Sequence, residues 1–100
     1  GRYIWNKRKA ELNIQNHNGI NFENAVKVFE DLYNIEEYDD ENSVYEERYN
    51  MTGFVGDFSF LVTVSLTMRG EFHRIFLARE ADGDEIGAYY ENVRACTGER

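Results

Sequence analysis

The sequence contains no proline and only one cysteine among its 100 residues. It also shows no internal repeat and no low-complexity tract, so nothing in it marks a linker between domains. A chain of this length with 42% hydrophobic residues can fill one core. We therefore expect residues 1–100 to form a single domain. Because the lone Cys96 cannot form a disulfide within the chain, the composition favours a reducing, cytoplasmic environment.

Long hydrophobic runs are absent as well. The most apolar stretch, residues 58–66, is interrupted by Ser59, Thr63 and Ser65. It is far shorter than the roughly 20 apolar residues of a membrane-spanning helix. The sequence also lacks a phosphate-binding glycine loop, a nucleophile elbow and a dinucleotide-binding fingerprint. We expect a soluble protein with no membrane partner.

The sequence has few residues that could hold a metal ion. Cys96 stands alone and His17 and His73 are far apart, which excludes a structural zinc set. The acids at positions 39–41 are contiguous and lack the alternating ligand spacing of a calcium loop. We therefore expect neither a metal nor another cofactor.

Cations are scarce overall, yet they are gathered in particular segments. The chain has 11 Lys and Arg against 19 Asp and Glu, which gives a net charge of -8. Acids dominate residues 23–47, whereas residues 48–79 hold four arginines, namely Arg48, Arg69, Arg74 and Arg79. The planar guanidinium group binds phosphate or carboxylate in a bidentate manner. This pattern predicts an anion-binding site on a sheet, and it suggests a basic partner for the acidic segment.

The spacing of apolar residues predicts an α+β fold. One helix should run from the N-cap Asn6 to about Asn16, a second should start near Asn21 with apolar positions as far as Tyr33, and a third should start at Asp82 with Glu85 as its capping-box partner. A short strand should precede the first helix, and residues 46–53, 58–69 and 71–79 also read as strands. We expect an antiparallel sheet of about four to five strands, packed against two N-terminal helices and followed by a C-terminal helix.

Each candidate cluster also has a simpler interpretation. Lys9, Asn13 and His17 recur every fourth residue, so they share one helix stripe, which is either a site or an ordinary polar face. Strand alternation places Arg74 and Arg79 on opposite faces unless a bulge intervenes. The arginines could instead form exposed ion pairs with nearby glutamates, which contribute only about 0–1 kcal/mol each. The acids considered for such pairs are Glu46, Glu47, Glu71 and Glu80.

Four short blocks, in order along the chain, resemble the BrnT-type toxin family, the ribonuclease partners of bacterial type II toxin–antitoxin pairs. The first block comprises Trp5, Asn6, Lys9, Asn13, His17 and Gly19, and the second Phe22 to Ala25 with Val28 to Asp31. The third comprises Asn42, Ser43, Glu46 to Tyr49 and Gly53, and the fourth Thr67 to Arg69 with Arg74 to Arg79. The chain departs from the family pattern at Leu32, Asn42, Leu77, Glu80 and Asp82.

The resemblance implies a RelE-like fold, RNA bound on one face of the sheet, and a ribbon-helix-helix antitoxin as partner in the bacterial cytoplasm. The first hypothesis is therefore a metal-independent endoribonuclease toxin. Its catalytic residues would be Lys9, His17, Arg48, Arg69 and Arg79, and its RNA-binding residues Arg74, Arg8 and Asn13. Both a homo-oligomer and a hetero-oligomer with the antitoxin are compatible with it.

The second hypothesis is a catalytically weakened interaction module on the same fold, which binds a basic antitoxin-like partner. In either case we expect five acids of the acidic segment to contact that partner and to take no part in RNA chemistry. They are Glu36, Glu37, Asp39, Asp40 and Glu41. The simpler alternative is a solvated loop that only aids solubility.

Overall fold

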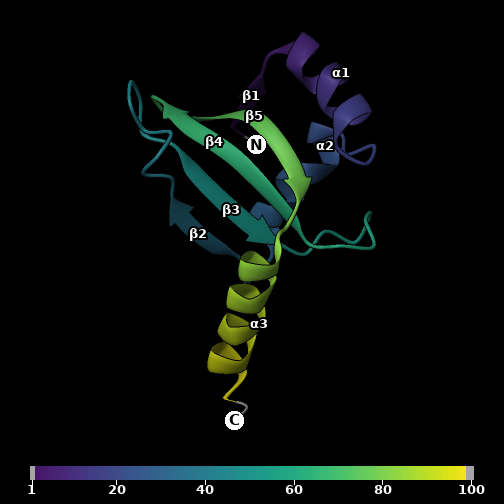
Figure 1. Cartoon of the computed structure of the whole chain (residues 1–100), viewed down its shortest axis with the longest axis vertical. Helices are drawn as coiled ribbons and strands as arrows, with labels where there is room; N and C mark the ends of the chain where they lie inside the picture. Colours follow the sequence, from purple (N-terminus) through teal and green to yellow (C-terminus); the bar gives the residue numbers. More distant parts are fainter. Residues whose placement is uncertain (1, 99–100) are drawn as a thin grey trace.

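One five-stranded sheet organises the fold, and the computed structural model describes residues 2–98 of the chain (Figure 1). Along the chain the elements are β1 (Tyr3–Trp5), α1 (Lys7–Asn16), α2 (Phe22–Ala25), the 3-10 helix η1 (Val26–Glu30), β2 (Ile35–Tyr38), β3 (Tyr49–Gly53), β4 (Val62–Arg69), β5 (Phe72–Glu80) and α3 (Gly83–Thr97). The strand order is β1-β5-β4-β3-β2. The α+β class is confirmed.

The sheet is mixed, so the expectation of a purely antiparallel sheet was wrong. β1 pairs with β5 in parallel, whereas β2 to β5 pair in antiparallel fashion. The parallel pair joins residues about 70 positions apart, with Tyr3 opposite His73. No local pattern reports that pairing, because the alternation of side chains is the same in parallel and antiparallel strands.

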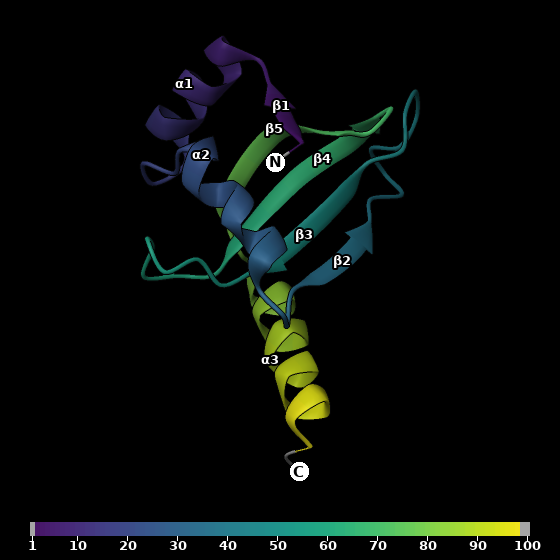
Figure 2. The same ribbon diagram turned by 180° about the vertical axis from the view of Figure 1, so that it is seen from behind.

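Helices α2 and η1 cover one face of the sheet, and α1 lies beside the β5 edge, as Figure 2 shows. Apolar side chains of α2 and η1 pack there against those of β3, β4 and β5, and Phe22 and Val28 are fully buried. The buried residues of this core are Ile20, Phe22, Ala25, Val28, Met51, Val55, Val62, Val64, Leu66, Ile75 and Ala78. The opposite face of β3, β4 and β5 looks toward the viewer in Figure 1.

The predicted helix starts are confirmed, because each depends only on neighbouring residues. The side chain of Asn6 accepts a hydrogen bond from Lys9 N at 3.0 Å, and Asn21 caps α2 in the same way. At the start of α3 the side chains of Asp82 and Glu85 each accept a hydrogen bond from the other's backbone N–H, at 2.9 Å in both cases. This reciprocal capping satisfies two backbone donors that the helix itself cannot.

The second helix is shorter than expected and does not reach Tyr33. It changes from α to 3-10 geometry at Val26, and the chain is extended at Asp31. The Asp31 carboxylate accepts hydrogen bonds from the backbone N–H of Tyr33 and Phe54 and from the hydroxyl of Tyr89, at 3.0, 2.8 and 2.6 Å. Because these partners lie on three separate segments, they hold Asp31 outside the helix.

The strands also differ in part from the sequence prediction. β4 begins at Val62 rather than at residue 58, and the preceding Phe58 and Phe60 stack on each other with ring centroids 5.6 Å apart. β3 begins at Tyr49 rather than at residue 46. Strand β2 was missed, because Glu36 and Glu37 made its sequence look like part of a charged loop.

A bulge at Phe76 decides which side chains of β5 share a face. Ser65 pairs with Leu77 and Leu66 pairs with Ile75, so Phe76 has no partner on β4. Arg74 and Arg79 pair with Thr67 and Thr63, which lie on the same face of β4. The bulge that the sequence argument required for these two arginines to share a face is therefore present.

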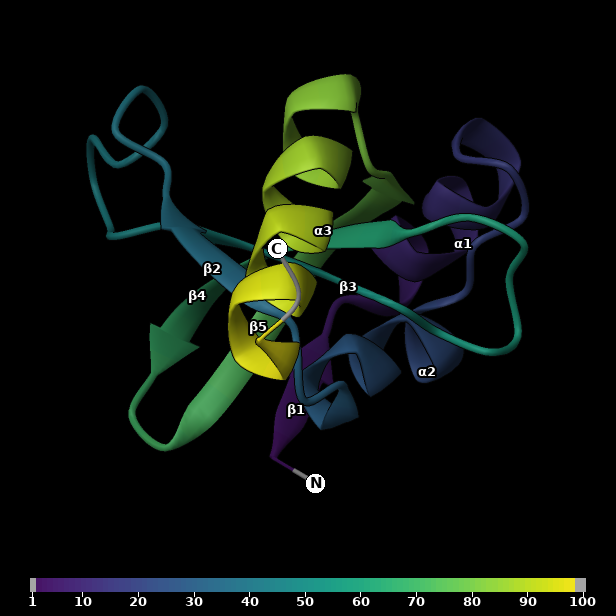
Figure 3. The same cartoon turned by 90° about the horizontal axis from the view of Figure 1, so that it is seen from below.

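Helix α3 follows β5 and starts on the side of the sheet opposite α2 and η1 (Figure 3). Besides the Tyr89–Asp31 bond, the side-chain amide of Asn92 donates to the carbonyl oxygen of Tyr33 at 2.9 Å. Burial and the bond to Asp31 raise the pKa of Tyr89, so its hydroxyl stays a donor. Between residues 2 and 98, no helix is long and apolar enough to cross a membrane.

Candidate functional site

The four predicted arginines lie on the sheet face opposite α2 and η1, which we call the arginine face. It comprises Arg48, Arg69, Phe72, Arg74, Phe76 and Arg79. Cross-strand pairing fixes the orientation of the outer side chains, since Arg69 stands opposite Phe72 and Thr67 stands opposite Arg74. Arg48 joins them because its guanidinium carbon lies 4.4 Å from the ring centroid of Phe76. The fold thus gathers cations that are up to 31 positions apart in the sequence.

Three of these arginines, Arg48, Arg69 and Arg79, form ion pairs with carboxylates. Glu46 contacts Arg69 at 3.3 Å and Arg48 at 3.8 Å, so one of the expected surface acids does pair with the cluster. Arg79 pairs with Glu85 and not with Glu80, because Glu80 stands opposite Val62 on the other face of the sheet. Within residues 2–98, Arg74 has no ion pair, and it is half-buried beside Thr67.

The Arg79–Glu85 pair is bidentate and partly shielded from solvent. The two guanidinium nitrogens of Arg79 donate to the two carboxylate oxygens of Glu85 at 2.7 and 2.9 Å, and Thr63 donates to the same carboxylate at 3.0 Å. Burial alone would raise the pKa of Glu85, but the hydrogen bonds from Arg79, Asp82 and Thr63 outweigh it and hold the pKa below its ordinary value. The hydrogen bond to Glu85 in turn raises the pKa of Arg79. Arg79 is therefore held as a neutralised cation at the start of α3.

Helix α1 brings two further predicted site residues to the border of the arginine face. Lys9, His17 and Phe76 line a hollow of about 210 Å³. The guanidinium of Arg48 packs over the ring of Phe76. The full lining is Lys9, Leu12, Asn13, Asn16, His17, Phe76 and Leu77. Phe76 therefore lies between the hollow that holds Lys9 and His17 and the guanidinium of Arg48. Arg8 is exposed on the same helix but does not line the hollow.

Asn13 was expected among the RNA-binding residues, and the structure shows its side chain buried and bonded to the backbone. It is only 4% exposed. Its side-chain amide donates to the carbonyl oxygens of Ile20 and Ala78 at 3.0 and 2.8 Å and accepts from the N–H of Ala78 at 3.1 Å. The Asn13 amide thus provides hydrogen-bond partners for the backbone N–H and carbonyl of Ala78, which lies on β5 beyond the residues that pair with β1. These bonds fix α1 to the sheet and so orient Lys9 and His17.

The acidic segment is partly strand and partly loop. Glu36 and Glu37 belong to the edge strand β2, and they face opposite sides of the sheet because they pair with Met51 and Asn50 on β3. Asp39, Asp40 and Glu41 follow in the loop to β3. Asp39 is anchored there, since its N–H donates to the carbonyl oxygen of Arg48 at 2.9 Å. The five acids are therefore not all on one solvated loop.

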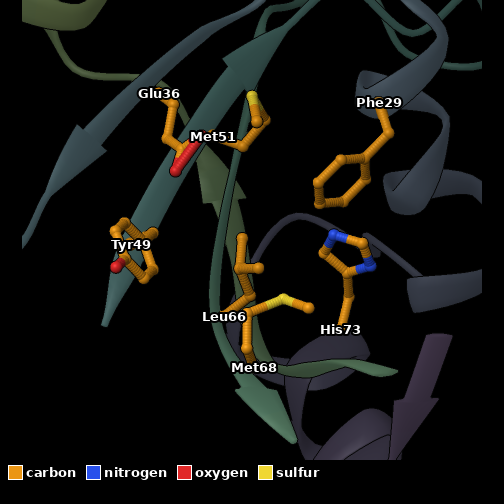
Figure 4. A pocket seen from close by; sticks show the side chains of 7 residues that line it. All are labelled: Phe29, Glu36, Tyr49, Met51, Leu66, Met68 and His73. Carbon is orange, nitrogen blue, oxygen red and sulfur yellow. The ribbon is translucent and has the colours of Figure 1, made fainter. Parts of the chain in front are cut away.

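A second hollow, of about 280 Å³, lies on the opposite face of the sheet from the arginines (Figure 4). It is lined by Phe29, Glu36, Tyr49, Met51, Leu66, Met68 and His73. The ring of His73 lies 5.0 Å from Phe29 and 5.4 Å from Tyr3, and its Nδ1 atom is buried without a hydrogen-bond partner. His73 therefore belongs to an aromatic cluster and not to the arginine face. The sequence analysis missed this hollow, although Met51, Leu66 and Met68 stand at alternate positions of their strands.

Among the described residues, no three or more His, Cys, Asp or Glu side chains lie close enough to hold a metal ion. A comparison with protein families finds that residues 5–85 match the family described as the ribonuclease toxin BrnT of a type II toxin–antitoxin system. The matched region contains every predicted site residue and ends within the first turn of α3. No curated protein gives a significant match to the chain.

Proposed function

The chain belongs to the BrnT family of ribonuclease toxins of type II toxin–antitoxin systems, and from this premise we propose that it is a metal-independent endoribonuclease that cleaves RNA on the arginine face. One observation carries the proposal. Lys9 and His17 on α1 border a hollow that adjoins Phe76 and Arg48 on the sheet. The arrangement therefore supplies a titratable group and several fixed cations to the same surface.

RNA cleavage without a metal needs three things. The 2′-hydroxyl must lose its proton, the phosphorane must be stabilised, and the departing 5′-oxygen must gain a proton. In our proposal Arg48, Arg69 and Arg74 hold the phosphate, because guanidinium groups bind phosphate oxygens in pairs. Fixed cations aimed at developing charge contribute several kcal/mol to catalysis.

The proton transfers fall to the hollow beside α1. His17 is half-buried at the C-terminal end of α1, and we assign it the role of acid or base, which contributes roughly 10² to 10⁴ in rate. Lys9 would stand near the scissile phosphate, and Arg8 would add charge at the border of the site. The departure from the family pattern at Leu77 falls in this hollow, where an apolar side chain replaces a serine.

Arg79 takes a marginal place in this proposal. A substrate phosphate reaches its guanidinium only by displacing or sharing the contacts with Glu85. Arg79 still contributes to the positive potential of the site to the extent that Glu85 does not cancel its charge. The proposed chemistry therefore depends on Arg48, Arg69 and Arg74 more than on Arg79.

Membership of a toxin–antitoxin family implies an antitoxin partner. We propose that this partner is a ribbon-helix-helix protein whose basic groups contact Glu36, Glu37, Asp39, Asp40 and Glu41. A RelE-like fold and a cytoplasmic location are part of the same proposal. We also propose that residues 1–100 act as one domain, because α3 is bonded to Tyr33 and Asp31 although most of it lies beyond the matched residues.

A second candidate function is an interaction module with little or no nuclease activity. It is favoured by the carboxylates that occupy three of the four arginines, since Glu46 and Glu85 compete with RNA phosphate for the same groups. In this case the chain would bind its antitoxin through the acidic segment and leave RNA intact.

An RNA degradation assay in EDTA separates the two candidates. Total RNA is incubated with the purified chain and with its Arg69→Ala, Arg74→Ala and Arg94→Ala variants. Arg94 is the matched control, because it is an exposed arginine on α3, away from the arginine face. We expect the wild type and Arg94→Ala to degrade RNA equally, and the other two variants to be slower by about tenfold or more. A folded wild type that leaves RNA intact would refute the nuclease proposal.

A further inference from the structure

Strand β5 presents two aromatic rings on the arginine face with a cation between them. Phe72, Arg74 and Phe76 occupy alternate positions before the bulge is passed, so their side chains leave the same face about 7 Å apart along the strand. Phe72 is 44% exposed and stands opposite Arg69. The core lies on the other face of the sheet, so neither phenylalanine serves to fill it.

The ring of Phe76 is covered by a flat cation. The guanidinium carbon of Arg48 lies 4.4 Å from the ring centroid, while Nε of Arg48 is buried without a hydrogen-bond partner. The Arg48 side chain is 37% exposed, so part of this group still faces solvent. A guanidinium held over an aromatic ring can offer its planar outer side to a nucleobase, which stacks on such planes.

We propose that the Phe72 ring and the outer plane of the Arg48 guanidinium are stacking platforms for two unpaired bases, while the edge of Arg48 and the side chain of Arg74 hold phosphate, so that the substrate is single-stranded RNA. This inference rests on the proposed ribonuclease function and specifies its substrate class. Single strands expose base faces that aromatic and guanidinium planes can cover, whereas a duplex hides those faces within its own stack. A surface that bound only duplex backbone would need cations but no exposed ring.

The charge of the surface favours a nucleic acid over a protein as the occupant. Arg74 lies between the two platforms and has no ion pair within the described part of the chain. A phosphate-binding cation between two planar groups, an aromatic ring and a guanidinium, matches the alternation of bases and phosphates along a strand. The acids that would suit a basic protein partner are instead concentrated on β2 and in the loop after it.

A binding experiment tests the inference without interference from cleavage. The probe is a fluorescein-labelled 2′-O-methyl oligoribonucleotide of mixed sequence, which lacks the attacking hydroxyl, used as a single strand and as a duplex with its complement. Anisotropy gives the affinity of the wild type and of Phe72→Leu, Arg48→Lys and Phe54→Leu. Leucine keeps an apolar side chain on the strand but removes the ring, and lysine keeps the charge but removes the plane. Phe54→Leu is the matched control, because Phe54 is 58% exposed but lies in the turn after β3 beside Asp31.

We expect the wild type to prefer the single strand. Phe72→Leu and Arg48→Lys should each weaken single-strand binding roughly fivefold or more and leave duplex binding unchanged, since stacking acts only on unpaired bases. Phe54→Leu should bind like the wild type. The Arg48→Lys variant should also keep the wild-type salt dependence, because its charge is unchanged.

Four results would overturn the inference. If Phe72→Leu binds the single strand as tightly as the wild type, the ring is not a platform. If single-strand and duplex affinity fall together, Phe72 only supports the neighbouring arginines. If the wild type degrades total RNA yet shows no preference for the single strand, the substrate class is wrong while the nuclease proposal stands. A wild type that neither binds the probe nor degrades RNA would overturn both.

Discussion

Replacing Asn13 with alanine should destabilise the protein strongly, because three hydrogen bonds of one buried amide are lost at once. The N–H and carbonyl of Ala78 and the carbonyl of Ile20 would lose their side-chain partner. A buried polar group left unsatisfied costs about 1–3 kcal/mol, so we expect a loss of about 3 kcal/mol or more in the free energy of unfolding. With a denaturant slope of roughly 2 kcal/mol per molar for urea, the unfolding midpoint should fall by about 1.5 M.

The assay is urea unfolding followed by circular dichroism, with Asn16→Ala as the matched control. Asn16 is exposed on the same helix, so the same substitution there should change stability by less than about 0.5 kcal/mol. Asn13→Ala should also slow RNA cleavage at temperatures where it is folded, because α1 carries Lys9 and His17, while the affinity for the uncleavable single strand should fall by no more than the loss of the one phosphate contact of Lys9. An unchanged midpoint together with weakened RNA affinity would refute this reasoning and return Asn13 to the RNA-binding residues.

Four further predictions follow from the site. First, if Lys9, Arg48, Arg69 and Arg74 make about four phosphate contacts, log affinity against log salt should have a slope near -3, and Arg74→Ala should reduce it to about -2; a flat response would exclude this binding surface. Second, because the folded-state pKa of Glu85 is lowered, its contribution to stability is present above the ordinary pKa of 4.5 and is lost as pH falls through the lower folded-state value. Urea midpoints of the wild type should therefore drop more steeply on acidification below about pH 4.5 than those of Glu85→Gln, and parallel profiles would show that the pair with Arg79 adds little. Third, replacing the five acids Glu36, Glu37, Asp39, Asp40 and Glu41 by Asn and Gln should slow association with a basic antitoxin in stopped-flow measurements and leave RNA cleavage unchanged or improved. An unaltered association rate would support a solvated segment, and lost cleavage in a folded variant would mean that the active site is misplaced. Fourth, expression without an antitoxin should slow bacterial growth, and a folded chain that leaves growth unchanged would favour the interaction module.

The sequence by itself determined the features that depend on near neighbours. The caps at Asn6 and at Asp82 with Glu85 were predictable because donor and acceptor are three residues apart. The alternation along β4 identified its core face from Val62 onward, because side chains of a strand alternate whatever the strand pairs with. The ordered family blocks likewise indicated the ribonuclease toxin family, and the match to residues 5–85 confirmed it.

Distant partners decided most of what the sequence analysis missed. The parallel pairing of β1 depends on β5, and the early end of the second helix depends on the hydrogen bonds that Asp31 accepts from Phe54 and Tyr89. Periodicity carries no information about such contacts, because they join segments that are far apart in the chain. Strand β2 was hidden for a related reason, since pairing with β3 outweighs the weak strand preference of its two glutamates.

The composition of the candidate site was decided by tertiary structure as well. The sequence identified Arg74 and Arg79 as candidates, but only the bulge at Phe76 places them on one face. Strand pairing places Glu80 on the other face of the sheet, so Arg79 pairs with Glu85 instead. In the sequence, Glu85 was identified only as the capping-box partner of Asp82. Asn13 lay on a stripe with Lys9 and His17, yet its amide is buried against β5. The type of a residue determines which kinds of contact its side chain can make. The packing of distant segments determines which of these contacts are formed.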